Sequence, residues 1–234
     1  MKKLLTFILS ISLSITAFAQ GNSIPKSSKF AEELPEILPD SVKYRYPLFN
    51  GVAISLNIFD PVLSSFLWDH ANYEATATFD FHHRFFPQFS FGMGYSNEKN
   101  DNELKYMVKA SPFFKVGLLY NFGYNSIKPK YYYYVLVRYG WSKFNADMEN
   151  LKFTDGYWDD YGPASVTGQS YNAQWIEAGG GVKVHIGGPI SLGWELTVRP
   201  LLSSGDNKYG NPYFVPGRGT HWLSFAFNFV YDIF

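Results

Sequence analysis

Residues 72–88, NYEATATFDFHHRFFPQ, change character at nearly every position. One alternating set is apolar and comprises Tyr73, Ala75, Ala77, Phe79 and Phe81. The intervening set is polar and comprises Glu74, Thr76, Thr78, Asp80, His82 and Arg84. Because successive side chains of a β-strand point to opposite faces, this period predicts a strand with one apolar face and one ionic face.

Seven further segments repeat this two-residue period: residues 51–59, 89–96, 114–123, 131–142, 175–186, 190–199 and 221–234. Their polar positions are rich in Gly and Ser with a few charges, whereas a water-facing strand would carry many Lys, Glu and Thr residues. Small and ionic side chains suit a crowded interior, and a face of repeated aromatic rings suits lipid. The pattern predicts an all-β fold, an antiparallel up-and-down transmembrane β-barrel of eight strands with a filled polar lumen.

The connections between these segments alternate between long and short. Short turns are expected at residues 85–88, 125–130 and 187–189, and long loops at residues 97–111 and 145–172. Outer-membrane barrels have short periplasmic turns and long outer loops, so an even strand number places both termini in the periplasm. A hairpin within residues 145–172 would raise the strand number to ten.

Composition narrows the classes of protein that fit. Aromatic residues make up 20% of the 234 residues, which is more than an ordinary soluble core needs. Lys plus Arg and Asp plus Glu number 20 each, so no basic surface favours nucleic acid. The chain has no cysteine, which excludes disulfides and thiol catalysis.

The N-terminus indicates export. Residues 1–20, MKKLLTFILSISLSITAFAQ, place two lysines before an apolar run and an Ala-Phe-Ala cleavage pattern. We therefore expect a signal peptide at residues 1–19, a proline-containing periplasmic arm at residues 20–47 and an outer-membrane barrel at residues 48–234.

The period assigns ten ionisable side chains to the lumen. The acids are Glu74, Asp80, Glu177, Glu195 and Asp232, and the bases are Arg84, Lys115, Arg138, Lys183 and Arg199. Because an unpaired buried charge is costly, this equal number predicts a structural ionic cluster in a non-conducting interior.

Three features of the sequence are candidates for chemistry. His82 and His83 are adjacent on a predicted strand and so cannot share a metal ion, which leaves no metal or cofactor predicted. Ser203, Ser204 and His221 would lie at neighbouring strand ends, as a lipid-modifying hydrolase at the barrel rim would require. A loop rich in rings and carboxylates, a candidate site for a glycan or a protein partner, contains Tyr157, Trp158, Asp159, Asp160 and Tyr161.

Four segments, YPLFNGVAISLNIFDP, FDFHHRFFPQFSFGMGYS, SPFFKVGLLYNF and RYGWSKF, resemble a family of small outer-membrane β-barrels of Bacteroidota of unknown function. The resemblance covers residues 44–234 and implies a barrel that the outer-membrane insertion machinery assembles in lipid, with no catalytic residues to carry over. We expect a non-catalytic structural or accessory subunit that binds an envelope partner through its loops or arm. The alternatives are a rim hydrolase and a narrow small-solute channel.

Overall fold

The computed structural model describes residues 46–66, 69–99, 105–124, 130–151, 164–205 and 210–233. The predicted signal peptide, nearly all of the predicted arm, the loop residues Tyr157 to Tyr161 and the terminal Phe234 lie outside the described residues. No helix in the described ranges is long and apolar enough to cross a membrane.

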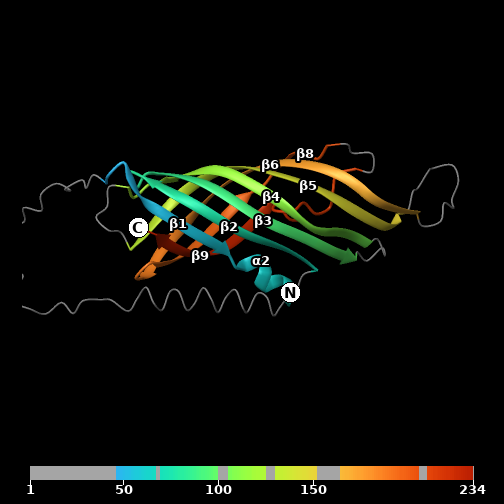
Figure 1. The fold of residues 1–234 in the computed structure, drawn as a ribbon, viewed down its shortest axis with the longest axis horizontal. Helices are drawn as coiled ribbons and strands as arrows, with labels where there is room; N and C mark the ends of the chain where they lie inside the picture. Colours follow the sequence, from blue (N-terminus) through green and yellow to red (C-terminus); the bar gives the residue numbers. More distant parts are fainter. Residues whose placement is uncertain are drawn as a thin grey trace, which may run out of the picture. The chain divides into compact units, whose positions relative to one another are not determined.

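The chain forms one antiparallel sheet that closes on itself (Figure 1). Its elements are β1 (Phe49–Asn57), α2 (Phe59–Ser64), β2 (His70–Phe81), β3 (Phe85–Lys99), β4 (Lys105–Asn121), β5 (Tyr131–Leu151), β6 (Ala164–Gly187), β7 (Ile190–Val198), β8 (Leu201–Ser203) and β9 (Leu223–Ile233). The ring runs β1-β2-β3-β4-β5-β6-β7-β9 and back to β1, and the short β8 pairs with β6 beyond the end of β7. The predicted all-β, antiparallel, barrel-like fold is confirmed.

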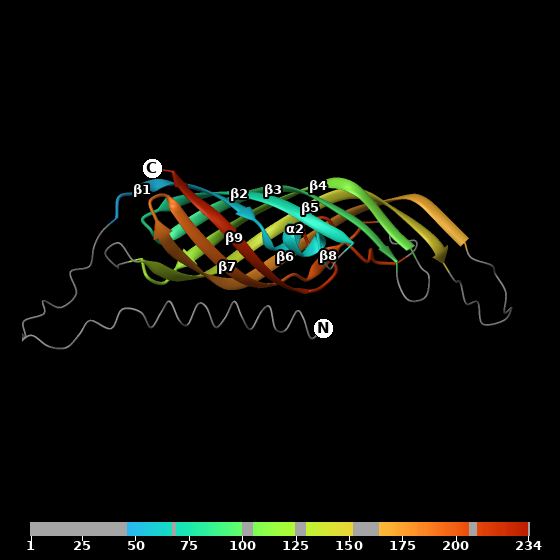
Figure 2. The same ribbon diagram turned by 90° about the horizontal axis from the view of Figure 1, so that it is seen from below.

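The two-residue period of the sequence becomes the two surfaces of the ring. On β5, Leu136 and Arg138 are buried inside, whereas Val135 and Val137 are 44% and 59% exposed outside. Figures 1 and 2 show β1 to β4 on one side of the ring and β7 and β9 on the other. The outward face is apolar on nearly every strand, which reverses the polarity of a water-soluble barrel.

The interior is narrow, and side chains of three kinds fill it, with one kind at each end and one in the middle. At the end of the ring where β2 turns into β3, polar side chains surround a cavity of about 540 Å³. In the middle lie charged side chains. At the opposite end an apolar core includes Phe113, Phe144, Tyr171, Trp175 and Phe214.

Residues 72–88 form a strand for only part of their length. β2 ends at Phe81, and residues 82–84 form the turn into β3. His82 and His83 have φ angles of 55° and 54°, in the left-handed region that turns use. The prediction that the strand continues through Arg84 and turns at residues 85–88 was therefore wrong, because a tight turn breaks the alternation three residues earlier.

The long loops were also predicted too long. β5 continues to Leu151 and β6 begins at Ala164, and Met148 still pairs with Val166. Likewise β3 reaches Lys99 and β4 begins at Lys105, within the expected loop of residues 97–111. These residues extend strands that already exist, so the ring keeps eight strands and the ten-strand alternative does not apply.

Candidate functional site

Charged side chains from five different strands, and from Arg199 directly after β7, converge in the middle of the ring. Three are acids and three are bases, and each side chain is at most 8% exposed: Glu74, Glu177, Glu195, Lys115, Arg138 and Arg199. We call these six residues the ionic cluster.

Lys115 joins two of the acids. Its Nζ lies 2.7 Å from Glu74 Oε2 and 2.9 Å from Glu177 Oε1. Glu177 Oε1 also accepts a hydrogen bond of 3.0 Å from Trp175 Nε1. One ammonium therefore connects β4 to β2 and to β6, each of which is separated from β4 by one strand.

Arg138 lies among all three acids of the ionic cluster. It pairs closely with Glu195, and its Nη1 lies 3.8 Å from Glu74 Oε1. Its Nε and Glu177 Oε2 are 3.4 Å apart but lack hydrogen-bond geometry, so this contact is purely ionic. Tyr134 donates its hydroxyl hydrogen to Glu195 Oε1 over 3.1 Å.

Arg199 closes the ionic cluster on the side of the apolar core. Its Nε lies 3.3 Å from Glu177 Oε1. Arg199 Nη1 donates to the carbonyl of Arg218, and Arg218 Nε donates to the carbonyl of Arg199. Three cations thus offset three carboxylates in a buried space, which ties the strands to one another and leaves the six residues with no net charge.

A second polar group, the turn-end group, lines the cavity and contains Asp80, His83, Lys183, Ser191 and Asp232. His83 Nδ1 lies 2.9 Å from Asp80 Oδ2, and Lys183 pairs with Asp232. Ser191 donates to Asp232 Oδ2 over 2.8 Å. The ten predicted lumen residues therefore divide into two groups with one exception.

The exception is Arg84, whose predicted pairing with lumen acids was wrong. Its guanidinium carbon lies 5.1 Å from the ring centroid of Phe85, 5.2 Å from that of Tyr120 and 4.7 Å from that of Tyr124. The turn at residues 82–84 shifts the phase, so His83, and not His82, contacts Asp80. The side chain of His82 is exposed and faces the carbonyl of Tyr46.

The residues proposed for a rim hydrolase lie in different settings. Ser204 is buried and donates to Asn211 Oδ1, and Ser203 Oγ accepts from the backbone of Gly205. β8, which carries Ser203, pairs with β6, and His221 precedes β9. In the described ranges, no three His, Cys, Asp or Glu side chains lie close enough to hold a metal ion.

The structure adds a set of residues that the period could not identify. The segment 213–219 folds into the ring, where Phe214 and Val215 are fully buried. Gly217 N donates to Asn72 Oδ1 over 2.7 Å, and Asn72 Nδ2 donates to Asp60 Oδ2 of α2 over 3.2 Å. Gly217 and Gly219 have left-handed φ angles of 84° and 80°, which glycine adopts readily. In the sequence, these two glycines were the available signal for a tight inward loop.

Burial raises the pKa of the Asp60 carboxyl above its ordinary value, and the nearby Arg199 opposes that rise only in part. Burial, followed by the charge of Arg199, lowers the pKa of the Arg218 guanidinium. The end of the ring that contains the apolar core therefore holds a carboxyl group whose charge is poorly solvated.

Comparison with known proteins bears on the whole chain. A search of curated proteins gave no match. A family model described as a domain of unknown function (DUF6048) matches residues 1–234. The protein belongs to this family of unknown function, DUF6048.

Proposed function

We propose that this protein is an integral outer-membrane β-barrel with a sealed interior, and that it serves as a structural or accessory subunit for an envelope partner. The observation that carries the proposal is the reversed polarity of the ring. Phe89, Phe91 and Phe114 are about half exposed on the outside, at 56%, 50% and 48%, while the ionic cluster lies inside. Water would penalise that outer surface, whereas hydrocarbon would solvate it.

The length of the outward apolar band supports a lipid environment. On β5 the outward residues are Tyr131, Tyr133, Val135, Val137, Tyr139 and Trp141, followed by Lys143. A tilted strand crosses a bilayer in about 9–11 residues, and rings at both ends suit the two interfaces. Positions 131–141 match that length and that pattern.

The filled interior argues for a non-conducting role. A ring of eight strands leaves space only for side chains or one small ligand. The ionic cluster occupies the middle, and the segment 213–219 with its buried Phe214 occupies one end. The rival reading as a small-solute channel would require both to move.

The β5–β6 hairpin is the surface that suits a partner best. In Figures 1 and 2 these two strands extend past the ring. On β5 the inward Phe144, Ala146 and Met148 are buried in the apolar core, while Lys143 and Asn145 are exposed outward. In this proposal the extension lies outside the cell, and the ends of β1 and β9, which pair through Val52 and Ile233, lie in the periplasm. The kinship of this protein with the small outer-membrane barrels of Bacteroidota is part of the same proposal.

Cell fractionation and gel mobility test the proposal. We expect the protein in the outer-membrane fraction, with an unboiled sample that migrates differently from a boiled one because the barrel stays folded in detergent. Recovery as a soluble monomer without detergent would contradict it. Steady single-channel currents in planar bilayers would replace it with the channel reading. An altered lipid acyl pattern in a His221→Ala strain would instead favour the hydrolase.

A further inference from the structure

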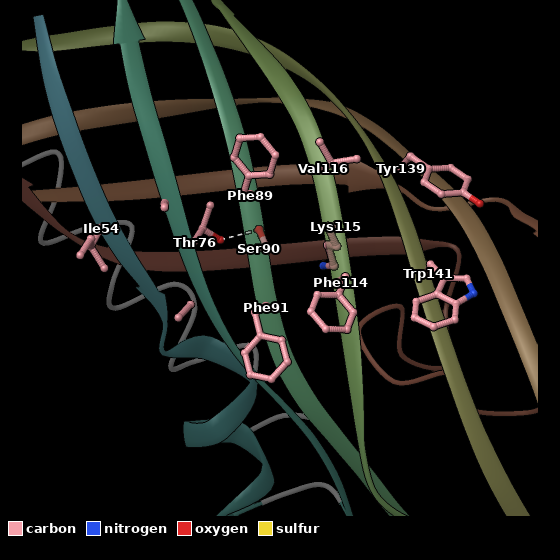
Figure 3. A pocket seen from close by; sticks show the side chains of 12 residues that line it. Ile54, Thr76, Phe89, Ser90, Phe91, Phe114, Lys115, Val116, Tyr139 and Trp141 are labelled. Atoms are coloured by element: carbon pink, nitrogen blue, oxygen red, sulfur yellow. Dashed lines mark hydrogen bonds between the residues drawn. The ribbon is translucent and has the colours of Figure 1, made fainter.

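The outer wall of the ring carries an apolar groove over β1 to β5 (Figure 3). Its volume is about 510 Å³. Two rows of outward side chains border it, and each row follows the register across neighbouring strands. We call them the first row (Phe91, Phe114, Trp141) and the second row (Phe89, Val116, Tyr139).

The first row is a continuous aromatic wall. The ring centroids of Phe91 and Phe114 are 5.1 Å apart, and those of Phe114 and Trp141 are 6.2 Å apart with nearly parallel planes. Figure 3 shows these three side chains along one border, with Phe89, Val116 and Tyr139 along the other.

The groove widens over β2 because two small residues stand in the rows. Ala75 pairs with Phe91, and Ala77 pairs with Phe89. Ile54 of β1 pairs with Ala77 and bounds the far side. Ala75 and Ala77 stand beside phenylalanine rings of β3, so β2 leaves a notch about as deep as one of these side chains.

The width of the groove indicates what fits in it. The Cα atoms of the two rows are two residues apart along each strand, about 7 Å at the rise of a β-strand, and the bordering side chains take up part of that width. An α-helix with its side chains is about 10–12 Å across and cannot enter such a space. A single extended hydrocarbon chain can.

The polar atoms beside the groove are already bound elsewhere. Tyr139 donates its hydroxyl hydrogen to Gln174 Oε1 over 2.9 Å, and Trp141 Nε1 donates to Asn172 Oδ1 over 2.7 Å. On the floor, Thr76 and Ser90 hydroxyls bond each other over 2.6 Å, and Lys115 Nζ points inward to Glu74. The groove therefore presents an almost entirely apolar surface to an occupant.

We propose that this groove is a binding site for one acyl chain of a membrane lipid, recognised through the chain and independent of the headgroup. The inference rests on the proposed membrane location and deepens it, because the groove lies within the outward apolar band. The aromatic wall and the notch at Ala75 and Ala77 hold the chain, and the lipid headgroup extends beyond the groove.

Native mass spectrometry of the full chain tests the site. The protein is inserted into vesicles of phosphatidylethanolamine or of phosphatidylglycerol, extracted in mild detergent and weighed. We expect the wild type to retain one lipid from either vesicle. The double substitution Ala75→Phe with Ala77→Phe fills the notch and should abolish retention. Ala178→Phe, an outward position on β6 that pairs with Val137 outside the groove, should keep it.

The outcomes separate the two proposals. Failure of the wild type to insert into vesicles overturns the membrane location itself. Insertion without a retained lipid, retention from only one kind of vesicle, or equal retention by the double variant overturns the acyl-chain site alone. A retained second protein chain in place of lipid also overturns it. If the double variant does not fold by gel mobility, the smaller filling Ala75→Leu is tested, and unchanged retention there counts against the site.

Discussion

Lys115 of β4 and Glu177 of β6 meet inside the ring, with 2.9 Å between Nζ and Oε1, although β5 lies between their strands. Strands separated by one neighbour lie about 10 Å apart, a span that a lysine and a glutamate side chain cover together. Ionic side chains are stable inside the ring only when each buried charge has a partner.

Glu177→Gln should destabilise the barrel strongly. The Glu177 side chain is fully buried, and its loss leaves Lys115, Arg138 and Arg199 with too few carboxylates. Breaking a buried pair on one side costs about 3–5 kcal/mol. Urea unfolding in lipid vesicles, followed by gel mobility, measures the change. Glu149→Gln removes an exposed partner 3.6 Å from Lys105 and should cost about 1 kcal/mol or less. Equal losses in the two variants would argue against a tightly coupled cluster.

Gly140→Ala should prevent the ring from closing. An added Cβ would overlap Cε2 of Trp175, whose indole is fully buried and cannot move aside. We expect little folded protein in a refolding assay that scores heat-dependent mobility. Gly187→Ala is the matched control on β6, where an added Cβ meets no atom within 4 Å, and it should fold normally. Normal folding of the Gly140 variant would mean that the interior has room for a methyl group beside Trp175.

Val137→Arg tests the proposal that the outward face meets lipid. Val137 is 59% exposed on the outward face, and an arginine near the bilayer midplane costs a β-barrel about 2–4 kcal/mol. Unfolding in vesicles should show this loss. Asn145→Arg lies on the same strand and the same face, beyond the apolar band, and should leave stability unchanged. A tolerated Val137→Arg would indicate that the outer face meets water or another protein.

Asp60→Asn should alter the pH dependence of stability. Burial raises the folded-state pKa of Asp60 above 3.8, so the folded chain holds this proton more tightly than the unfolded chain. The contribution of Asp60 is therefore most favourable at low pH and is lost as pH rises from 3.8 through the raised pKa. We expect the variant to be more stable than wild type at neutral pH, with a gap that closes in acid. Denaturant midpoints across pH measure the gap. A less stable Asp60→Asn at neutral pH would mean that Arg199 depends on the charge.

Local alternation was sufficient to assign most faces. Leu136 and Arg138 point inward, and Val135 and Val137 point outward, as the period of the sequence predicts. The alternation predicted the wrong surroundings for Arg84, because the left-handed turn at His82 and His83 depends on contacts that a two-residue period does not encode. The predicted ends of β5 and β6 were wrong for a similar reason, since Met148 becomes a strand residue only through its pairing with Val166.

The sequence by itself determined that the chain is all-β, that its strands have one apolar and one polar face, and that charges balance on the polar face. These properties follow from the order of neighbouring residues along each strand. Tertiary structure alone decided which charges meet, because Glu74, Glu177 and Glu195 reach Lys115 and Arg138 only when strands distant in sequence close into a ring. It also decided that the segment around Phe214 enters the ring and that Ala75 and Ala77 form a notch, since both depend on the side chains that register places beside them.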